Sequence, residues 1–420
     1  MFDDDIPVRA PISQDHGDTR TGPTKIERFA HRSARTTFAQ LFHGCLPESY
    51  DSSMGAKDSF ASPGPEDDRT QALADRLFRD AGAALELYTI YLGERLGLYR
   101  ALAERGPATS SELAERTGTA ERYVREWLEH HAASGLVEVD DTRAEPGARR
   151  YRLPPEHIRV LADPDDLRYE AHKGVEIARA GRRLPQLIEA FRTGDAPPTI
   201  PWEPEGRAEF NRPLFLNLLG KEWLPAIPDV DRRLRADPPV RVADVACGTG
   251  WAAIAMAQAY PQAAVDGFDL DQDAIAAARK HAEEAGLAGR VSFSVVDAAD
   301  PPQTSGYDLV TIIEALHDMA RPVEALRGAR KMLAGGGTLL VVDELVEDEF
   351  TAPASDRERY NYGWSVMSCL PDAMGDPQTR ATGAVMRPST LRRYATEAGF
   401  RDMQVLPIRT DYWRFYRLIP

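Results

Sequence analysis

The chain is poor in cysteine, in basic residues and in long apolar runs. Only Cys45, Cys247 and Cys369 occur among its 420 residues, and their spacing indicates neither a disulfide framework nor a zinc site. Acidic residues outnumber basic ones by 66 to 51, a formal charge of −15, which argues against binding of nucleic-acid phosphates or anionic lipid. No apolar run approaches the roughly 20 residues that span a bilayer, and no secretion signal opens the chain. We therefore expect a soluble, cytoplasmic protein with no bound metal and with neither nucleic acid nor membrane as a partner.

Residues 1–68 are rich in Asp, Ser, Pro, Thr and Gly and show no sustained period of 3.6 or 2. This composition predicts a disordered N-terminal extension. Met54 lies inside it, so two interpretations stay open: residues 1–53 belong to the physiological protein, or translation begins at Met54. Neither interpretation gives the extension any chemistry.

Residues 69–165 show helical periodicity followed by two short strand patterns, which is typical of a winged helix. Ser110 and Thr119 are expected to cap two of its helices, with a tight turn at Gly118. Residues 71–165 contain 17 Asp and Glu against 13 Lys and Arg, a net charge of −4 (13 − 17), which would repel a DNA backbone. We therefore expect the domain to form a homodimer or a wall of a substrate site.

Residues 166–235 are interpreted as a helical connector that also lines a substrate pocket. Over residues 236–420, short apolar strands alternate with amphipathic helices, which predicts an α/β fold with a doubly wound parallel sheet. Ligands of such sheets bind outside the carboxyl ends of the strands. The first strand ends in DVACGTG, whose two glycines allow a tight turn and close approach of a ligand. Because GTGWAA also satisfies a dinucleotide-binding pattern, this loop alone does not choose the cofactor.

Three acidic residues follow three successive strands. Asp244 suits the cationic amino group of a methionine moiety and would be a poor neighbour for a pyrophosphate. Asp269 is placed to accept hydrogen bonds from ribose hydroxyls, and Asp297 from the exocyclic amine of adenine. Each could alone be a helix cap, but together they predict a nucleoside pocket and favour S-adenosylmethionine.

The motifs DVACGTG, GFDLDQDAI, VVDAAD and YDLVTIIEALHDMA resemble those of class I S-adenosylmethionine-dependent methyltransferases. With the winged-helix pattern in front, residues 75–420 are similar to a mycobacterial-type family whose substrates are largely unassigned, and more distantly to plant-type small-molecule O-methyltransferases. The resemblance implies a seven-stranded Rossmann-like sheet in the order 3-2-1-4-5-7-6, closed by a hairpin. Ala246 departs from it, since the commonest motif has Gly there. The implied cofactor-binding residues are Asp244, Ala246, Cys247, Gly248, Thr249, Gly250, Asp269, Leu270, Asp297, Ala298 and Glu314.

The resemblance also implies methyl transfer by in-line displacement to an oxygen or nitrogen of a small organic acceptor, leaving S-adenosylhomocysteine. In the plant-type enzymes a His-Asp pair after the fourth strand supplies the base, which implies a catalytic His317, with Asp343 and Glu344 the nearest candidates to orient its ring. Those enzymes carry Trp where this chain has Met319. An alternative stays open, in which His317 binds the sugar of the cofactor or caps the helix that opens with Pro322.

The acceptor pocket is expected between the fifth strand and the last helix. Tyr360, Trp364 and Met367 fall on one helical face, although a plain core stripe would have the same spacing. Phe210, Trp223 and Asp318 are expected to complete a cavity for a small organic molecule. Two other functions stay open: a cofactor-sensing regulator that uses the winged helix, and an enzyme on the same scaffold that does not transfer methyl.

Overall fold

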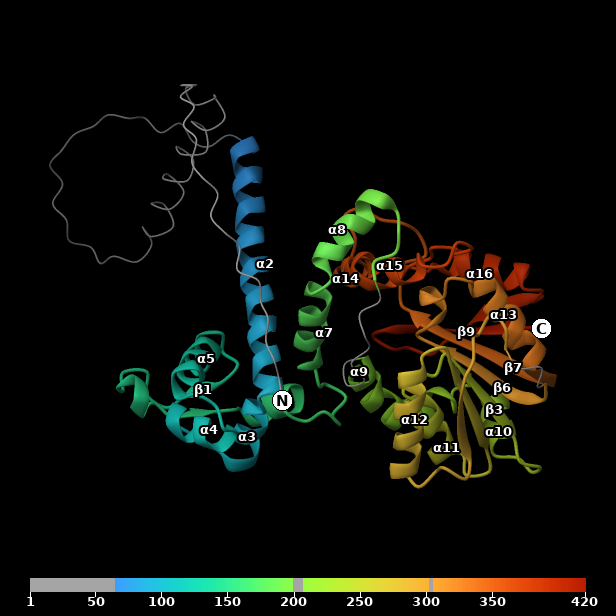
Figure 1. The fold of residues 1–420 in the computed structure, drawn as a ribbon, viewed down its shortest axis with the longest axis horizontal. Coiled ribbons are helices and arrows are strands. Elements are labelled where there is room, and N and C mark those ends of the chain that lie inside the picture. The colour runs from blue at the N-terminus through green and yellow to red at the C-terminus, as the bar shows by residue number, and fades with distance from the viewer. Residues whose placement is uncertain (1–64, 199–206, 302–304) are drawn as a thin grey trace, which may run out of the picture. The chain divides into compact units, whose positions relative to one another are not determined.

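The computed structural model describes residues 65–198, 207–301 and 305–420 (Figure 1). Residues 1–64 of the predicted extension, which include Met54, lie outside the described residues. Residues 65–68, assigned to that extension above, are instead the start of helix α2 (Pro65–Arg95), which has three acidic residues in its first turn. Carboxylates there stabilise a helix through its dipole and unpaired N–H groups. No helix in the three described ranges is long and apolar enough to cross a membrane.

The winged-helix prediction is confirmed in its elements. Three helices precede a two-stranded antiparallel sheet, and a further helix follows it. The elements are α3 (Leu98–Arg105), α4 (Ser110–Thr117), α5 (Glu121–Ala133), β1 (Glu138–Val139), the 3₁₀ turn η1 (Pro146–Ala148), β2 (Tyr151–Arg152) and α6 (Pro155–Leu161).

Both predicted caps are wrong by one residue. Thr109, not Ser110, caps α4, because its hydroxyl accepts the N–H of Glu112 while the Glu112 carboxylate accepts the Thr109 N–H. Helix α5 follows Ala120 and has no side-chain cap. Thr119 is unavailable because its hydroxyl is bonded to a threonine of the preceding turn.

A series of helices leads from the winged helix to the sheet. Residues 199–206 of this connector lie outside the described residues. Pro213 cannot donate to the helix ladder, and wider π-turns begin two residues after it. The elements are α7 (His172–Gly181), α8 (Leu184–Thr193), α9 (Arg207–Leu214), the π-helix η2 (Phe215–Trp223) and α10 (Pro228–Leu234).

Seven strands form one sheet, and the predicted order is confirmed. Five of these strands, β3 to β7 in chain order, pair in parallel. Strand β9 runs antiparallel to β7 and β8, as the closing hairpin requires. Across the sheet the strands are β5 (Val291–Val295), β4 (Ala264–Asp269), β3 (Arg241–Val245), β6 (Tyr307–Ile313), β7 (Leu333–Glu344), β9 (Trp413–Ile419) and β8 (Asp402–Val405).

Helices cover both faces of the sheet (Figure 1). Val242 and Leu340 belong to one core cluster with η2 and the helices α11 and α12, whereas their chain neighbours Ala243 and Val341 belong to the other cluster with α13 and α16. This alternation follows from the two-residue period of a strand. Because both faces are covered, ligands can approach only an edge of the strands. The covering helices are α11 (Trp251–Ala259), α12 (Gln272–Glu284), α13 (Pro322–Met332) and α16 (Pro388–Glu397).

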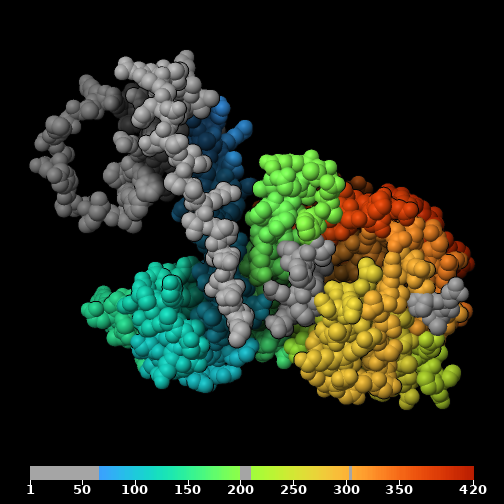
Figure 2. All heavy atoms as spheres, viewed as in Figure 1, coloured from blue at the N-terminus to red at the C-terminus, as the bar shows by residue number. Residues whose placement is uncertain are grey.

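The segment between β7 and α16 packs against α7 and α8, and Figure 2 shows the two in contact. Arg183 forms an ion pair with Asp372 at 2.5 Å, and the ammonium of Lys173 lies 6.0 Å from the ring centre of Tyr360. These contacts close one side of the region beyond the strand ends. The segment comprises α14 (Asp356–Trp364), the π-helix η4 (Ser365–Cys369) and α15 (Leu370–Ala373).

The contact between η2 and α11 gives a test of this packing. A Cβ at Gly220 would fall on the Cβ of Ala259, so Gly220→Ala forces the two helices apart. We expect a loss of about 1–3 kcal/mol in the free energy of unfolding, measured by urea denaturation. Gly363→Ala is the matched control, because a Cβ there meets nothing within 4 Å. Equal stability of the two variants would contradict the packing described.

Candidate active site

The loop after β3 carries the predicted glycine motif and turns sharply. Gly248 and Gly250 have φ of 53° and 83°, and Ala246 has φ of 58°. A left-handed conformation costs a non-glycine residue roughly 1–2 kcal/mol, and such strain is concentrated at functional sites. A Cβ at Gly250 would lie 2.5 Å from the ring of Phe293. The loop therefore holds its backbone close to the sheet edge, where ligands of this fold bind.

Asp244, at the end of β3, is 2% exposed. The hydroxyl of Thr311 donates to its Oδ1 at 2.8 Å, while its Oδ2 has no hydrogen-bond partner among the described residues. Burial raises the pKa of this carboxyl to about 7. Leaving such an oxygen buried without a donor costs about 1–3 kcal/mol. A cationic group placed beside it would offset that cost, so the residue fits the ammonium of a methionine moiety.

Asp269 closes β4 and ties it to the glycine loop. Its Oδ2 accepts the N–H of Gly248 at 2.8 Å, and its Oδ1 accepts the N–H of Asp271 at 2.9 Å. Burial raises the pKa of Asp269. Leu270, next in the chain, is 70% exposed. A carboxylate oxygen has two lone pairs, so each oxygen of Asp269 can still accept a hydrogen bond from a ligand.

Asp297 follows β5 and is ion-paired. Its Oδ2 accepts from Arg321 at 2.6 Å and its Oδ1 from the N–H of Ala299 at 2.8 Å. Ala298 is half-buried beside it. The predicted contact of Asp297 with adenine therefore has to share this carboxylate with an arginine, and it stays a prediction.

Two further residues of the predicted set shape the glycine loop. The Cys247 N–H donates to the carbonyl of Phe268 at 3.0 Å, and burial raises the pKa of its thiol, which keeps the sulfur protonated and unreactive. The carbonyl of Thr249 accepts from Nδ1 of His281 at 3.0 Å. Both residues hold the loop in place through the backbone.

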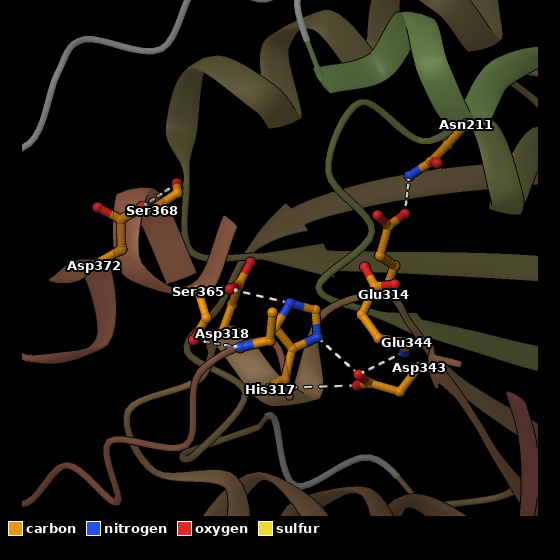
Figure 3. Close-up of polar contacts among 10 residues, drawn as sticks. Asn211, Glu314, His317, Asp318, Asp343, Glu344, Ser365, Ser368 and Asp372 are labelled. Carbon is orange, nitrogen blue, oxygen red and sulfur yellow. Dashed lines mark hydrogen bonds and ion pairs between the residues drawn. The ribbon is translucent and has the colours of Figure 1, made fainter. Parts of the chain in front are cut away.

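Glu314 follows β6 in a strained conformation, with φ of 52°. Its N–H donates to the carbonyl of Val342 at 2.7 Å, and its carboxylate accepts from the amide of Asn211 on α9 (Figure 3). Glu344 lies next to it, at the end of β7 (Figure 3). Burial and then the charge of Glu314 raise the pKa of Glu344 well above its usual 4.5.

His317 lies between two carboxylates, and Figure 3 shows its ring with Asp343 on one side and Asp318 on the other. Nδ1 is 2.8 Å from Oδ1 of Asp343, and Nε2 is 3.2 Å from Oδ1 of Asp318. The imidazole is 3% exposed. Burial alone would lower the pKa of His317, but the charges of Asp343 and Asp318 raise it well above 6.5.

The same cluster includes Cys369, at the end of η4. One ligand atom each from His317, Asp318 and Cys369 lie within 4.8 Å of one another. Metal coordination requires a lone pair on the imidazole. Against its burial, the charges of Asp343 and Asp318 raise the pKa of His317 and so favour a protonated ring, which offers no lone pair to a metal.

One cavity of about 880 Å³ lies beside the ends of β6 and β7, and Glu314 is the one predicted cofactor-binding residue among the residues that line it. Glu314, His317 and Glu344 form its polar end, and Asp271, two residues beyond β4, also lines it. Of the residues predicted for the acceptor pocket, five line this cavity: Phe210, Asp318, Tyr360, Trp364 and Met367. They are brought together from α9, from the loop after β6 and from α14 and η4.

Trp223, predicted for the pocket, does not line this cavity. It is 4% exposed and packs edge-on against Trp413 and Phe415 of β9 at 5.5 and 5.4 Å between ring centres. The broad apolar face of η2 is buried on the sheet, so its largest side chain is a core residue.

Two polar partners in the site were not predicted. Thr311 is the only hydroxyl residue within the apolar run LVTII, a signal that could have indicated its bond to Asp244. Asn211 reaches Glu314 across 103 positions of sequence, and no local pattern marks it.

Comparison with known proteins identifies both domains. Residues 236–397 match the family described as methyltransferase domain, and residues 83–163 match the Rv2258c-like winged HTH domain. Residues 236–397 therefore form a methyltransferase domain. As in that family, its cofactor is S-adenosylmethionine, which the orphan oxygen of Asp244 and the glycine loop fit.

Relatives of this methyltransferase include enzymes named for oxygen acceptors. The 3-hydroxy-5-methyl-1-naphthoate 3-O-methyltransferase of Streptomyces sahachiroi is 29% identical over 61% of this chain and 73% of its own. The ubiquinone biosynthesis O-methyltransferase of Bordetella avium is 33% identical over 32% of this chain and 52% of its own. Among solved structures, human N-acetylserotonin methyltransferase matches with a TM-score of 0.60 at 19% identity, covering 87% of this chain and 99% of that one. The structural match supports the fold.

Asp244→Asn tests the fit of this methyltransferase to its cofactor. An acid whose pKa is raised on folding destabilises the folded state as pH increases, here from about 4 to about 7. At pH 8 the neutral amide should therefore stabilise the cofactor-free protein by roughly 1–3 kcal/mol while weakening S-adenosylmethionine binding at least about 10-fold. Thermal melts with and without cofactor measure both effects.

Asp266→Asn is the control. Asp266 is half-buried and paired with Arg241 at 3.0 Å on the sheet, and interactions with Ser292, Arg241 and Tyr307 outweigh burial to lower its pKa. Its amide variant should lose stability at pH 8 and keep its cofactor affinity. Unchanged cofactor affinity in Asp244→Asn would remove Asp244 from the binding site.

Proposed function

We propose that the protein methylates a hydroxyl oxygen of a small aromatic acceptor. The observation that carries this proposal is the single cavity that has the His317 cluster at one end and Tyr360 and Trp364 as walls. Aromatic faces bind flat organic rings, and a polar cluster at the reacting end fixes which atom approaches the methyl group. The relatives named for naphthoate and ubiquinone biosynthesis support an aromatic acceptor and an oxygen nucleophile.

The cofactor is proposed to lie along the ends of β3, β4 and β5. Asp244 would hold the ammonium through its Oδ2, and the backbone from Ala246 to Gly250 would line the methionine moiety. Asp269 would accept the ribose hydroxyls, and the exposed Leu270 would pack on the adenine. Asp297 and Ala298 would meet the adenine edge, and Glu314 would face the cofactor near its reactive end.

The bound cofactor would supply a methyl group on a positively charged sulfur. The protein then has two tasks, to align the acceptor oxygen with that methyl group and to take the hydroxyl proton. Alignment in a dry cavity is worth up to roughly 7–11 kcal/mol. Proton transfer to a positioned side chain adds about 10²- to 10⁴-fold, or roughly 3–5 kcal/mol. The aromatic walls therefore contribute more to the rate than the His317 cluster does.

Methyl transfer can be followed directly. The full chain is incubated with S-adenosylmethionine and probe acceptors such as 1,4-dihydroxy-2-naphthoic acid, catechols and the corresponding amines. Mass spectrometry should detect S-adenosylhomocysteine together with an O-methylated product. Methylation of the amines alone would contradict the oxygen acceptor, and a modified acceptor without S-adenosylhomocysteine would indicate an enzyme that does not transfer methyl.

His317→Ala should separate catalysis from binding. Loss of the imidazole removes the group that holds the polar end of the cavity, so turnover should fall at least about 10²-fold. Affinity for S-adenosylmethionine should stay within about 3-fold, because none of the proposed cofactor contacts is removed. Calorimetry and a methyl-transfer assay give the two values. His130→Ala, on α5, is the control, and an equal loss of affinity and turnover in His317→Ala would assign His317 to cofactor binding.

The winged-helix domain is proposed to join two chains in a cytoplasmic homodimer. Helix α2 exposes a row of large apolar side chains, each 41 to 71% exposed. Apart from the adjacent Leu77 and Phe78, successive members are three, four or seven residues apart, which places most of them on one helical face. Monomeric proteins rarely expose such a patch. They are Leu73, Leu77, Phe78, Leu85, Tyr88 and Leu92.

Negative charges introduced into this row of apolar side chains should therefore separate the two chains of the dimer. Wild type should sediment with twice the 46.5 kDa mass of the chain, and the double variant Leu77→Glu, Leu85→Glu as a monomer, because buried like charges in both copies repel. Tyr123→Glu is the control, since Tyr123 is 83% exposed on α5 and should leave the mass unchanged. A dimeric double variant would exclude this face of α2 as the interface.

A further inference from the structure

Both ring nitrogens of His317 lie close to carboxylate oxygens: the contact with Asp343 is a hydrogen bond, and the contact with Asp318 is an ion pair without hydrogen-bond geometry. Nδ1 is 2.8 Å from Asp343 and Nε2 is 3.2 Å from Asp318. An ionised carboxylate accepts hydrogen bonds and cannot donate them, and a neutral imidazole has only one N–H. A ring that carries both protons donates to Asp343 through Nδ1 and places its positive charge beside Asp318. An imidazolium has no lone pair, so in this form His317 cannot take a proton from an acceptor.

Asp318 is the most exposed member of this cluster. Its side chain is 22% exposed, whereas that of His317 is 3% and that of Asp343 is 1% exposed. Asp318 also lines the cavity. The Asp343 carboxylate has a second hydrogen-bond donor, because it also accepts the N–H of Glu344 at 2.9 Å. The Asp318 carboxylate is therefore open to a molecule in the cavity.

The charges around His317 support the imidazolium. Two carboxyl groups of β7, those of Asp343 and Glu344, face the ring. Asp318 faces it from the turn η3 (Leu316–Asp318), which also carries His317, and the thiol of Cys369 faces it from η4. The charge of Glu314, which follows β6, raises the pKa of Glu344 and so acts on this cluster indirectly. Burial disfavours the charged ring, but the Asp343 and Asp318 carboxylates raise the pKa of His317. One positive charge between acidic neighbours is the favourable state.

We propose that the Asp318 carboxylate takes the proton of the acceptor hydroxyl, and that His317 is a permanently charged positioning residue. The inference rests on the proposed O-methylation. As the oxygen–methyl bond forms, the methyl–sulfur bond breaks and its electron pair stays on sulfur. The hydroxyl proton moves to the Asp318 carboxylate, which becomes a neutral carboxyl group. Asp318 later releases this proton to water.

A carboxylate is a weak base, but the reaction makes the proton strongly acidic. The acceptor oxygen gains positive character as it bonds to the methyl group, so its proton can move to a group of low pKa late in the step. The nearby imidazolium keeps Asp318 ionised and holds its oxygens toward the cavity. The transfer therefore does not require a neutral histidine at physiological pH.

The charge state of His317 can be measured without any acceptor. Histidine-selective ¹⁵N labelling of the full chain, with and without S-adenosylhomocysteine, gives ring-nitrogen shifts that distinguish an imidazolium from a neutral ring, and His317→Ala assigns the signal. We expect two protonated ring nitrogens from about pH 6 to about pH 8. A neutral His317 ring at about pH 7 overturns the proposal, whether or not a probe acceptor is methylated.

Asp318→Asn keeps the shape of the side chain and an oxygen that can accept from Nε2, but the amide cannot take a proton. Turnover of the probe acceptors should fall at least about 10²-fold, with S-adenosylmethionine affinity within about 3-fold. Wild-type turnover should stay level as pH falls from about 8 to about 6. Asp402→Asn is the control, because Asp402 lies on β8 with its side chain 55% exposed and does not line the cavity.

Full turnover in Asp318→Asn, or wild-type turnover that rises with the loss of the His317 proton, would assign the base to His317 and leave O-methylation intact. A wild type that does not bind S-adenosylmethionine would instead contradict the proposed function. The two failures are therefore distinguishable.

Discussion

The parallel pairing of β6 with β7 is the constraint on which the site depends. Ile313, the last residue of β6, lies opposite Val342, so the last two residues of β7 extend beside the residues that follow β6. Asp343 thereby reaches the ring of His317, and Glu344 lies next to Glu314. A shift of one residue in this register would turn Asp343 to the opposite face of the sheet. The buried apolar residues on both faces fix the register, so the core of the fold also sets the geometry of the cluster.

The site keeps several groups in states that cost stability. Asp244 is buried with one oxygen unpartnered, and Ala246 and Glu314 adopt left-handed backbone conformations. A protein selected for stability alone would have no need of them. All three lie at the carboxyl ends of β3 and β6, where a cationic, nucleoside-bearing ligand would turn the unfavourable terms into binding contacts.

The sequence predicted what depends on local pattern. Strand ends are marked by the change from apolar to polar residues, so the positions of Asp244, Asp269 and His317 along the chain could be read, and the order of the sheet followed from the resemblance. Contacts that depend on tertiary register could not be read. Trp223 was placed in the pocket because an amphipathic helix does not reveal which of its faces meets the sheet. Thr109 was missed as a cap because Ser110 beside it has the same chemistry.

The central claim is that the strand ends of this chain bind S-adenosylmethionine. Isothermal titration calorimetry of the full chain with S-adenosylmethionine, and separately with S-adenosylhomocysteine, tests it most directly. The account predicts one site per chain for each compound, with a dissociation constant in the micromolar range or below, roughly −7 kcal/mol or better. Absence of binding for both compounds at about 1 mM, where a constant of that size corresponds to roughly −4 kcal/mol, would contradict it.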